Sequence, residues 1–464
     1  MTNIPKILIM TFNKYILGAL ATLAVSSAAV AQNTESAYFV DDYTYRFQMN
    51  PAYDNSKNFV AIPALGNMNV TMNGTLHVKD VIYNVNGQTT TFLSPYLSPE
   101  EVMKNLDGNK RIGADIKIPI LAAGFKAWGG YNTITLSARA SLGLKTPGTL
   151  FSFLKEGVSN RSYDLSGTRA FGTAYGEIAL GHSRNINKKL RVGGALKFLI
   201  GVGDLSANFK TANLELNEND WRITSEAEIN ASMKGMTYKT KTNSHTGHQY
   251  VNGMDYDSFG LNGFGMAIDL GATYQLLPDV ELSMALLDFG FISWSENQLA
   301  TTNGEKTFNT DRYTFSADDD APNSFEHQWD NMRDDISAIY ELDDAGNSGG
   351  RTTMLGATLN IGAKYTLPMY RNLNFGVLNT TRIQGAFSWT DFRFSANIAP
   401  VKWVDGGINL SAGTFGAGFG WIVNFHPTGF NFFVGMDHTL GKTTKEFIPL
   451  SSNASLNLGM NILF

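Results

Sequence analysis

The sequence offers few side chains that could form a catalytic centre. It contains no cysteine, which excludes disulfides, thiolate nucleophiles and cysteine-bound zinc. Seven histidines are scattered along the chain, and no serine, histidine and aspartate have a spacing that indicates a hydrolase triad. No glycine-rich phosphate loop follows a predicted strand and opens a helix. We therefore expect no enzymatic activity and no cofactor, and a barrel hydrolase is the least favoured class.

Metal binding is not expected either. The stretch "SHTGHQY" places His245 and His248 three residues apart, without a third ligand nearby. Carboxylates cluster in "SADDDAPN" and in "ELDDAGNSG", but they lack the regular ligand spacing of a calcium-binding loop. The sequence thus predicts solvated acidic loops and no metal site.

Charged side chains also occur inside strand-like segments, where their position predicts a lumen. On the polar face of these segments, six basic residues balance six acidic ones. Such a balance favours internal ion pairs or a filled lumen over the one-sided charged ring of an ion-selective pore, and for any one pair a purely structural role is the stronger interpretation. The predicted lumen-facing charges are Asp115, Lys117, Arg139, Glu177, Lys197, Asp269, Lys364, Arg382, Asp391, Arg393, Asp405 and Asp437.

The inward position of these charged side chains is predicted from a regular alternation of apolar and polar residues along the chain. The final stretch "SLNLGMNILF" alternates without interruption, and so do "RIGADIKIPI" and "TITLSARASLGL". A period of two indicates strands with one apolar and one polar face. Fourteen such segments can be counted, and Asp288 is an exception because it falls on the apolar side of its segment. A bulge there, or a position above the membrane, would explain it.

The links between the segments alternate in length. Short turns such as "WGGYN" and "HPTG" are separated by long polar loops at about 79–110, 146–172, 201–263, 295–353 and 439–453. Outer-membrane barrels have this organisation, and in lipid a sheet must close on itself to pair every backbone group. We therefore predict an all-β fold, a transmembrane antiparallel barrel of 14 strands over residues 66–464. Two further segments within 204–236 have apolar faces that are interrupted by polar residues. They are expected to form a hairpin outside the membrane, and a barrel of 16 strands is the alternative.

The first residues predict export. Lys6 and Lys14 precede an apolar run that ends in Ala29, Val30 and Ala31, which predicts a signal peptide over 1–31 and cleavage before Gln32. No later run of about 18 apolar residues could form a spanning helix. The net charge of −5 gives no indication of a nucleic-acid partner. We expect a monomer in the outer membrane, surrounded by its lipid.

Residues 32–65 are expected to form a plug inside the barrel. This segment is too long for a simple lead-in to the first strand, and it carries Tyr38, Phe39, Tyr43, Tyr45 and Phe47. At the other end, the last strand must pair with the first to close the barrel. Its final residue, Phe464, resembles the signal that the outer-membrane barrel-assembly machinery recognises, so this machinery is an expected partner.

Two resemblances follow from particular motifs. In "YRFQMNPAY", residues Asn50, Pro51 and Ala52 resemble the Asn-Pro-Ala motif of the FadL-type long-chain fatty acid transporters. Blocks such as "GGALKFLIG" and "LLDFGFISW" resemble a family of uncharacterised outer-membrane barrels common in Bacteroidota. The resemblance implies a 14-stranded barrel, an N-terminal plug to which the three motif residues belong, and a path for a hydrophobic ligand.

The resemblance leads to two functional hypotheses. The first is passive uptake of a small hydrophobic or amphipathic compound, captured by the outer loops and passed by a displaced plug. In "PGTLFSFLKEG", a short predicted helix groups Leu150, Phe151, Phe153 and Leu154, which could form a capture patch or simply pack on the loop. The alternative is a non-transporting envelope scaffold or a partner in secretion or assembly, because one fold supports several functions.

Overall fold

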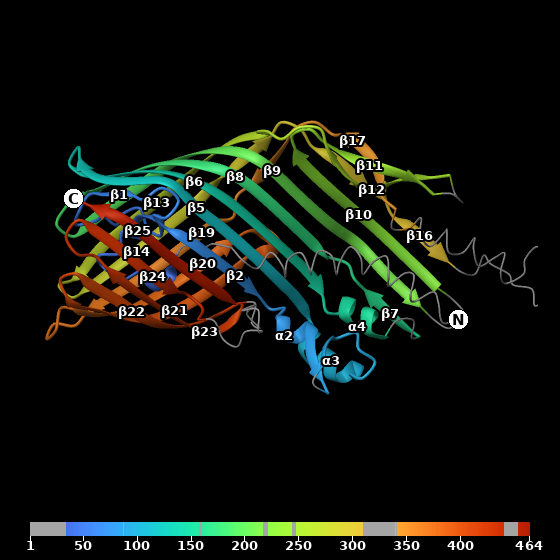
Figure 1. Cartoon of the computed structure of the whole chain (residues 1–464), viewed down its shortest axis with the longest axis horizontal. Helices are drawn as coiled ribbons and strands as arrows, with labels where there is room; N and C mark the ends of the chain where they lie inside the picture. The colour runs from blue at the N-terminus through green and yellow to red at the C-terminus, as the bar shows by residue number, and fades with distance from the viewer. Residues whose placement is uncertain are drawn as a thin grey trace, which may run out of the picture.

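A computed structural model describes residues 34–86, 88–156, 160–216, 221–243, 247–309, 339, 341–439 and 453–464 (Figure 1). The predicted signal peptide lies outside these residues. The described chain is dominated by one antiparallel sheet that closes into a barrel. No helix in these ranges is long and apolar enough to cross a membrane.

The barrel has 14 strands, as the alternation predicts. The first is interrupted and consists of β1 (Phe59–Ala61) and β2 (Met68–Gly74), which share the same two neighbours. The eighth likewise combines β18 (Arg351–Met354) and β19 (Ala357–Thr366), both paired with β14. The others are β5 (Asn109–Ala127), β6 (Gly130–Pro147), β8 (Arg169–Asn185), β9 (Leu190–Leu216), β13 (Gly263–Leu277), β14 (Val280–Trp294), β20 (Leu373–Ile383), β21 (Trp389–Val401), β22 (Val404–Gly413), β23 (Gly416–Phe425), β24 (Phe430–Met436) and β25 (Ala454–Leu463).

The last strand closes the barrel against the first. In β25, Leu463 is the register partner of Phe59 in β1, and Leu458 is the partner of Met68 in β2. Just beyond the strands, Asn58 and Phe464 exchange two backbone hydrogen bonds of 3.0 and 3.1 Å. The predicted closure is therefore confirmed. Because the wall begins at Phe59, the boundary expected at residue 66 is too late and β1 belongs to the barrel.

The two faces of the wall separate as the alternation predicts. In β6, the side chain of Ile134 points outward and is 47% exposed, while Thr133 and Thr135 on either side are buried. A strand places successive side chains on opposite faces, so a closed sheet has an apolar outside and a polar inside. Large exposed side chains such as Phe198, Met284 and Phe394 continue the apolar outer surface on other strands.

The two described segments within 204–236 pair with each other beyond the barrel, which excludes the 16-strand alternative. The first part of β9 pairs with β13, whereas its last part pairs with β10 (Trp221–Met233). Figure 1 shows this extension at the end of the barrel opposite the C-terminus. The extension also contains β11 (Met236–Thr242), β12 (Gln249–Tyr256), β15 (Gln298–Thr301), β16 (Lys306–Asn309) and β17 (Asp343–Asn347).

A second apolar core lies among the long loops. It is built around α3 (Pro99–Leu106) and α4 (Thr149–Glu156), and it includes side chains from the β9–β10 hairpin. The helix α3 begins with Ser98, whose Oγ accepts a 3.1 Å hydrogen bond from the backbone N–H of Glu101. Small elements complete this region: α2 (Val78–Val81), β3 (Ile82–Val85), β4 (Gln88–Thr91), β7 (Arg161–Asp164) and the 3-10 turn η4 (Gly385–Phe387).

The expected capture patch lies inside this loop core. Leu150, Phe151, Phe153 and Leu154 are all at least 95% buried. The ring of Phe151 packs edge-on against Phe92, and that of Phe153 packs against Tyr163. An exposed capture surface is therefore the wrong interpretation of these residues. They form a helix packed on the loops, because four large apolar side chains on one short helix are most stable when neighbouring loops cover them.

Asp288 is turned inward by a bulge. In the pairing of β13 with β14, Ile268 faces Phe289 and Leu270 faces Leu286, so two residues of β14 lie opposite one residue of β13. Asp288 has a positive φ of 56° and is 7% exposed. The extra residue shifts the alternation, and this places the carboxylate in the lumen instead of on the apolar outer surface.

Candidate functional site

The lumen is occupied by residues 34–58, which we call the N-terminal segment. It contains two 3-10 turns, η1 (Glu35–Ala37) and η2 (Arg46–Gln48). Tyr38, Phe39, Tyr43 and Tyr45 are each at most 3% exposed. Because the inner wall is polar, the tyrosine hydroxyls find partners there: Tyr38 donates to Ser283 Oγ at 3.1 Å and Tyr45 donates to Asn461 Oδ1 at 2.7 Å.

The Asn-Pro-Ala residues lie at the contact between this segment and the wall. Asn50 is fully buried, and its Nδ2 donates to the carbonyl oxygens of Ala272 and Met284 at 3.3 and 3.4 Å. Its Oδ1 accepts a 2.9 Å hydrogen bond from the N–H of Ala52, which closes a tight turn around Pro51. The motif therefore fixes the shape of the segment and also attaches it to β13 and β14.

Glycines in the wall make room for these contacts. Gly193 in β9 and Gly271 in β13 are register partners. A Cβ atom added to Gly193 would overlap the backbone of Pro51, and one added to Gly271 would overlap the Asn50 side chain and lie 2.8 Å from Pro51 Cδ. The ring of Phe39 occupies the corresponding space at Gly376 in β20. Glycine in a strand often marks such a close approach.

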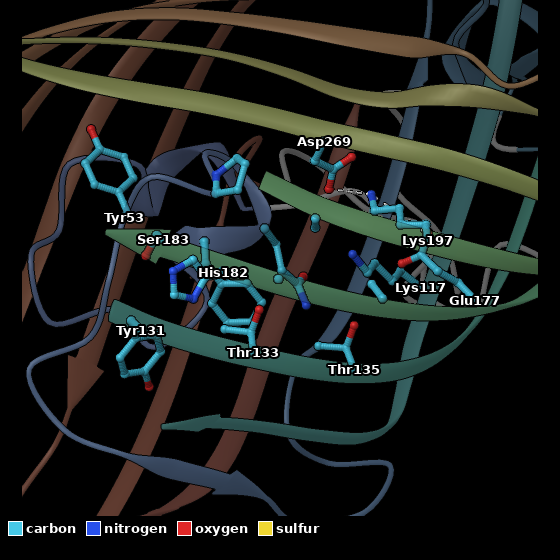
Figure 2. Close-up of a pocket in the computed structure, with 16 residues that line it drawn as sticks. Tyr53, Lys117, Tyr131, Thr133, Thr135, Glu177, His182, Ser183, Lys197 and Asp269 are labelled. Carbon is cyan, nitrogen blue, oxygen red and sulfur yellow. Dashed lines mark ion pairs between the residues drawn. The ribbon is translucent and has the colours of Figure 1, made fainter. Parts of the chain in front are cut away.

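Five lumenal charges, four of them predicted and the fifth Asp288, meet in one network with one residue from each of five neighbouring strands. Figure 2 shows three of them, Glu177, Lys197 and Asp269. Arg139 lies 2.7 Å from Glu177 and 2.9 Å from Asp288. Lys197 lies 2.6 Å from both Asp269 and Asp288. All five side chains are at most 14% exposed. Paired charges of this kind connect the strands across the lumen and leave little excess charge to select ions.

A second group of charges connects the wall to the N-terminal segment. Arg393 lies 3.0 Å from Glu35 and 3.2 Å from Asp391. The carboxylate of Asp437 accepts hydrogen bonds of 2.6 and 3.0 Å from the N–H groups of Ser36 and Glu35. These contacts fix the start of the segment to β21 and to the end of β24.

Four further predicted lumenal charges, apart from Asp405, also lie on the inner wall. Lys364 pairs with Asp41 of the N-terminal segment at 2.9 Å. Asp115 accepts a 2.6 Å hydrogen bond from Ser141 Oγ. Arg382 donates to Thr358 Oγ1 at 3.2 Å. Lys117 is 9% exposed and borders two separate cavities.

Small cavities remain between the segment and the wall, and three of them have volumes of about 20–40 Å³. The first lies between Pro51, Tyr53 and the inner faces of β6, β8 and β9, and Figure 2 shows Lys117, Glu177 and Lys197 at one end of it. The second shares Lys117 with the first, and the third shares Glu35 with the second. Each has room for about one or two waters, so the described lumen is packed and polar.

Two groups of polar residues show no sequence pattern that predicts their proximity, although Asp405 is among the predicted lumen-facing charges. The amides of Asn424, Asn431 and Asn461 are linked in a chain of hydrogen bonds, and those of Asn67 and Asn457 form a second pair to which the Tyr43 hydroxyl donates. Asp42, Asp405 and His426 also converge, although they are distant in the sequence. Of the two loop histidines, His248 lies between Glu341 and Asp343 at 2.9 and 2.7 Å. His245 and the "SADDDAPN" cluster lie outside the described residues.

The fold and the lumen together define a closed β-barrel filled by its own N-terminal segment. Residues 51–437 match the model of a family of unknown function, DUF5723, and the chain belongs to this family. The expected membership of an uncharacterised family is thus confirmed. No curated protein sequence matches the chain.

Solved structures with a similar chain path are barrels of low sequence identity. The Ralstonia pickettii toluene transporter TbuX is 9% identical with a TM-score of 0.39, and the match covers 94% of this chain and 95% of that one. A Pseudomonas aeruginosa FadL homologue is 7% identical with a TM-score of 0.33 over 94% of both chains. The translocator domain of autotransporter NalP from Neisseria meningitidis scores 0.30 at 8% identity, over 89% of this chain and 90% of that one. Scores this low support no inference about function.

Proposed function

We propose that this protein is an outer-membrane barrel that admits a small hydrophobic or amphipathic compound, with the N-terminal segment acting as a movable plug. The single observation that carries the proposal is an interruption of the wall beside the aromatic core of the plug. Residues 62–67 separate β1 from β2 and leave the regular ladder, and irregular backbone hydrogen bonds join them to β25 and β5, such as that from Met460 N–H to the Leu65 carbonyl at 2.8 Å. On the neighbouring strand, the register of β5 shifts between Pro119 and Leu121.

The outer surface beside this interruption is apolar, and aromatic side chains lie behind it inside the barrel. Leu65, Ile120 and Leu121 are 40–52% exposed on the outer surface. On the inside, the ring of Tyr45 lies 5.5 Å from that of Phe59, which in turn is 6.1 Å from Phe47. Pro119 cannot donate a ladder hydrogen bond, which weakens pairing locally. A compound released between Tyr45 and β1 would therefore meet an apolar exit through the wall.

A displaced plug is compatible with the contacts that hold it. Most of them are neutral hydrogen bonds, such as those of Asn50 to Ala272 and Met284, and each contributes about 0.5–1.5 kcal/mol. Ionic contacts to the wall are made by Glu35 with Arg393, Asp41 with Lys364 and Asp54 with Arg191. The segment can thus move by exchanging its partners for water, whereas the wall ladder remains intact.

An envelope scaffold is the second candidate. It is favoured by the packed lumen, where five charges are mutually paired and the cavities are only 20–40 Å³. A barrel of this kind would serve as an anchor for another protein bound at its loops or turns. The two functions differ in whether the plug has to move.

A reversible tether between plug and wall separates the two candidates. Thr44 Oγ1 donates to Asn431 Oδ1 at 2.9 Å, and the natural chain has no cysteine. Thr44→Cys and Asn431→Cys, joined by a disulfide or a short reducible thiosulfonate linker, would hold the plug in place. In lipid vesicles, we expect the tether to abolish uptake of an amphipathic fluorescent probe and reduction to restore it, with each single variant as control.

The purified protein also allows a second measurement, which identifies the molecules that co-purify with it. A stoichiometric small hydrophobic molecule, identified by mass spectrometry and lost when residues 38–52 are altered, supports passage. Probe uptake that does not respond to the tether, together with a stoichiometric protein in the purified sample, would contradict passage and favour the scaffold.

A further inference from the structure

Three residues from distant parts of the chain converge at the short-turn end of the barrel. Asp42 belongs to the N-terminal segment, Asp405 lies at the beginning of β22, and His426 occupies the turn between β23 and β24. His426 Nε2 lies 3.5 Å from Asp405 Oδ1 and 4.0 Å from Asp42 Oδ2. One potential ligand atom from each residue lies within 4.8 Å of the other two.

The histidine gives a second, independent observation that points to a ligand at this position. His426 is 95% buried, and its Nε2 makes no hydrogen bond although it faces both carboxylates. A buried nitrogen without a partner costs free energy unless a proton shared with a partner or a bound ion satisfies it. Asp405 is 96% buried beside it, so water has little access to this side of the group.

We propose that Asp42, Asp405 and His426 bind a divalent transition-metal ion of the Zn²⁺ class. One imidazole nitrogen and two carboxylate oxygens form a common zinc ligand set, with bonds of about 2.0–2.2 Å. Around a tetrahedral ion such bonds place the ligand atoms roughly 3.3–3.5 Å apart. The separations of 3.5 and 4.0 Å from the histidine nitrogen need only a small contraction, and the two carboxylate oxygens, which lie within 4.8 Å of each other, close on the ion by movement of the exposed Asp42 side chain. The Asp42 side chain is 42% exposed, which leaves the fourth position open to water.

Neighbouring groups orient the ligands. Asp405 accepts a 2.7 Å hydrogen bond from Asn424 Nδ2 on Oδ1 and a 3.1 Å bond from the N–H of Asp42 on Oδ2. Ser56 Oγ donates to Asp42 Oδ1 at 3.1 Å, which leaves Oδ2 to face the histidine. The backbone N–H of His426 donates to the carbonyl of Trp403 at 2.8 Å. Hydrogen bonds to the carboxylates hold metal ligands in position and adjust their basicity.

The consequence is a metal clasp between the N-terminal segment and the wall. Asp42 is the contribution of the segment, while Asp405 and His426 belong to two different parts of the wall. A bound ion would therefore hold the segment in its place. This inference does not depend on passage of any compound, since a permanent plug in a scaffold could be clasped in the same way.

The test uses the full-length protein, purified in mild detergent without a histidine tag and stripped with a chelator. Zn²⁺ is then titrated in competition with a chromogenic zinc indicator. We expect one equivalent per chain, and an affinity at least tenfold lower in His426→Ala and in Asp405→Asn. His182→Ala is the matched control, because His182 also faces the lumen but bonds to Asn132 Oδ1 at 2.9 Å. Its affinity for Zn²⁺ should equal that of the wild type.

A second measurement detects the clasp itself. In Thr44→Cys, Zn²⁺ should slow modification of the thiol severalfold, and the added His426→Ala substitution should remove this effect. Heat-dependent gel migration verifies that each variant is a folded barrel. The proposal is wrong if the wild type binds less than one equivalent of Zn²⁺, or if His426→Ala binds it as tightly as the wild type does.

Discussion

Gly193 on β9 and Gly271 on β13 are register partners, and together they form the surface on which Asn50, Pro51 and Ala52 rest. Each glycine would bring an added Cβ atom into the N-terminal segment. The two positions therefore offer a way to move the segment without changing it.

The first prediction concerns this glycine pair. Gly271→Ala should displace the N-terminal segment, because the added methyl group overlaps the Asn50 amide and lies 2.8 Å from Pro51 Cδ. We expect the thiol of Thr44→Cys to react with a polar maleimide severalfold faster in this background. Gly172→Ala on β8 is the control, since a Cβ atom there meets nothing within 4 Å. Equal labelling rates in the two backgrounds would show that the segment tolerates the methyl group where it lies.

The second prediction concerns the lumenal charge network. Lys197→Met removes the cation that lies 2.6 Å from both Asp269 and Asp288. Removing one partner of a buried ion pair typically destabilises a protein by about 3–5 kcal/mol. We expect a clear loss of stability in urea-induced unfolding of the purified barrel in detergent.

Lys210→Met is the matched control for this substitution. Lys210 pairs with Glu226 at 3.1 Å, but this pair lies on the exposed part of the β9–β10 hairpin. Exposed ion pairs contribute little to stability because water screens them. If both substitutions had the same small effect, the network would be no more than a solvated set of charges.

The barrel itself could be predicted from sequence because lipid and water impose a strict alternation on every strand. Lys197 and Asp269 follow this alternation, and the structure pairs them. Asp288 breaks it, and the break correctly indicated an irregularity, although the sequence alone did not distinguish a bulge from a position above the membrane.

Contacts between segments that are distant in sequence could not be predicted in the same way. His426 and Asp42 are brought together only when the N-terminal segment enters the barrel. Neither residue has a regular spacing from the other, so no local pattern connects them. The burial of Phe151 has the same origin, because its cover comes from separate loops and from the β9–β10 hairpin. The alternation of a strand carries no information about such packing.

The third prediction concerns this loop core. Phe151 is 1% exposed, and truncation of a buried phenylalanine to alanine costs about 3–5 kcal/mol. Because the loop core is separate from the wall, Phe151→Ala should open the loops and leave the barrel folded. Limited proteolysis should then cleave the loops around α4 faster, with no change in heat-dependent gel migration. Phe259→Ala, at a residue that is 90% exposed, should leave the cleavage rate unchanged.

The last prediction separates the role of Phe464 in assembly from any role in stability. Its side chain is 67% exposed and its contribution to closure is made by the backbone, through the two hydrogen bonds with Asn58. Substitution of an exposed side chain usually changes stability by no more than about 0.5 kcal/mol. Phe464→Ala should therefore refold in detergent and unfold in urea like the wild type.

In cells, however, we expect a severalfold lower amount of assembled barrel, because the proposed recognition signal is lost. Ile462→Ala on the same outer face, at 52% exposure, is the control and should assemble normally. An unchanged amount of assembled Phe464→Ala would show that the terminal ring is not what the assembly machinery recognises.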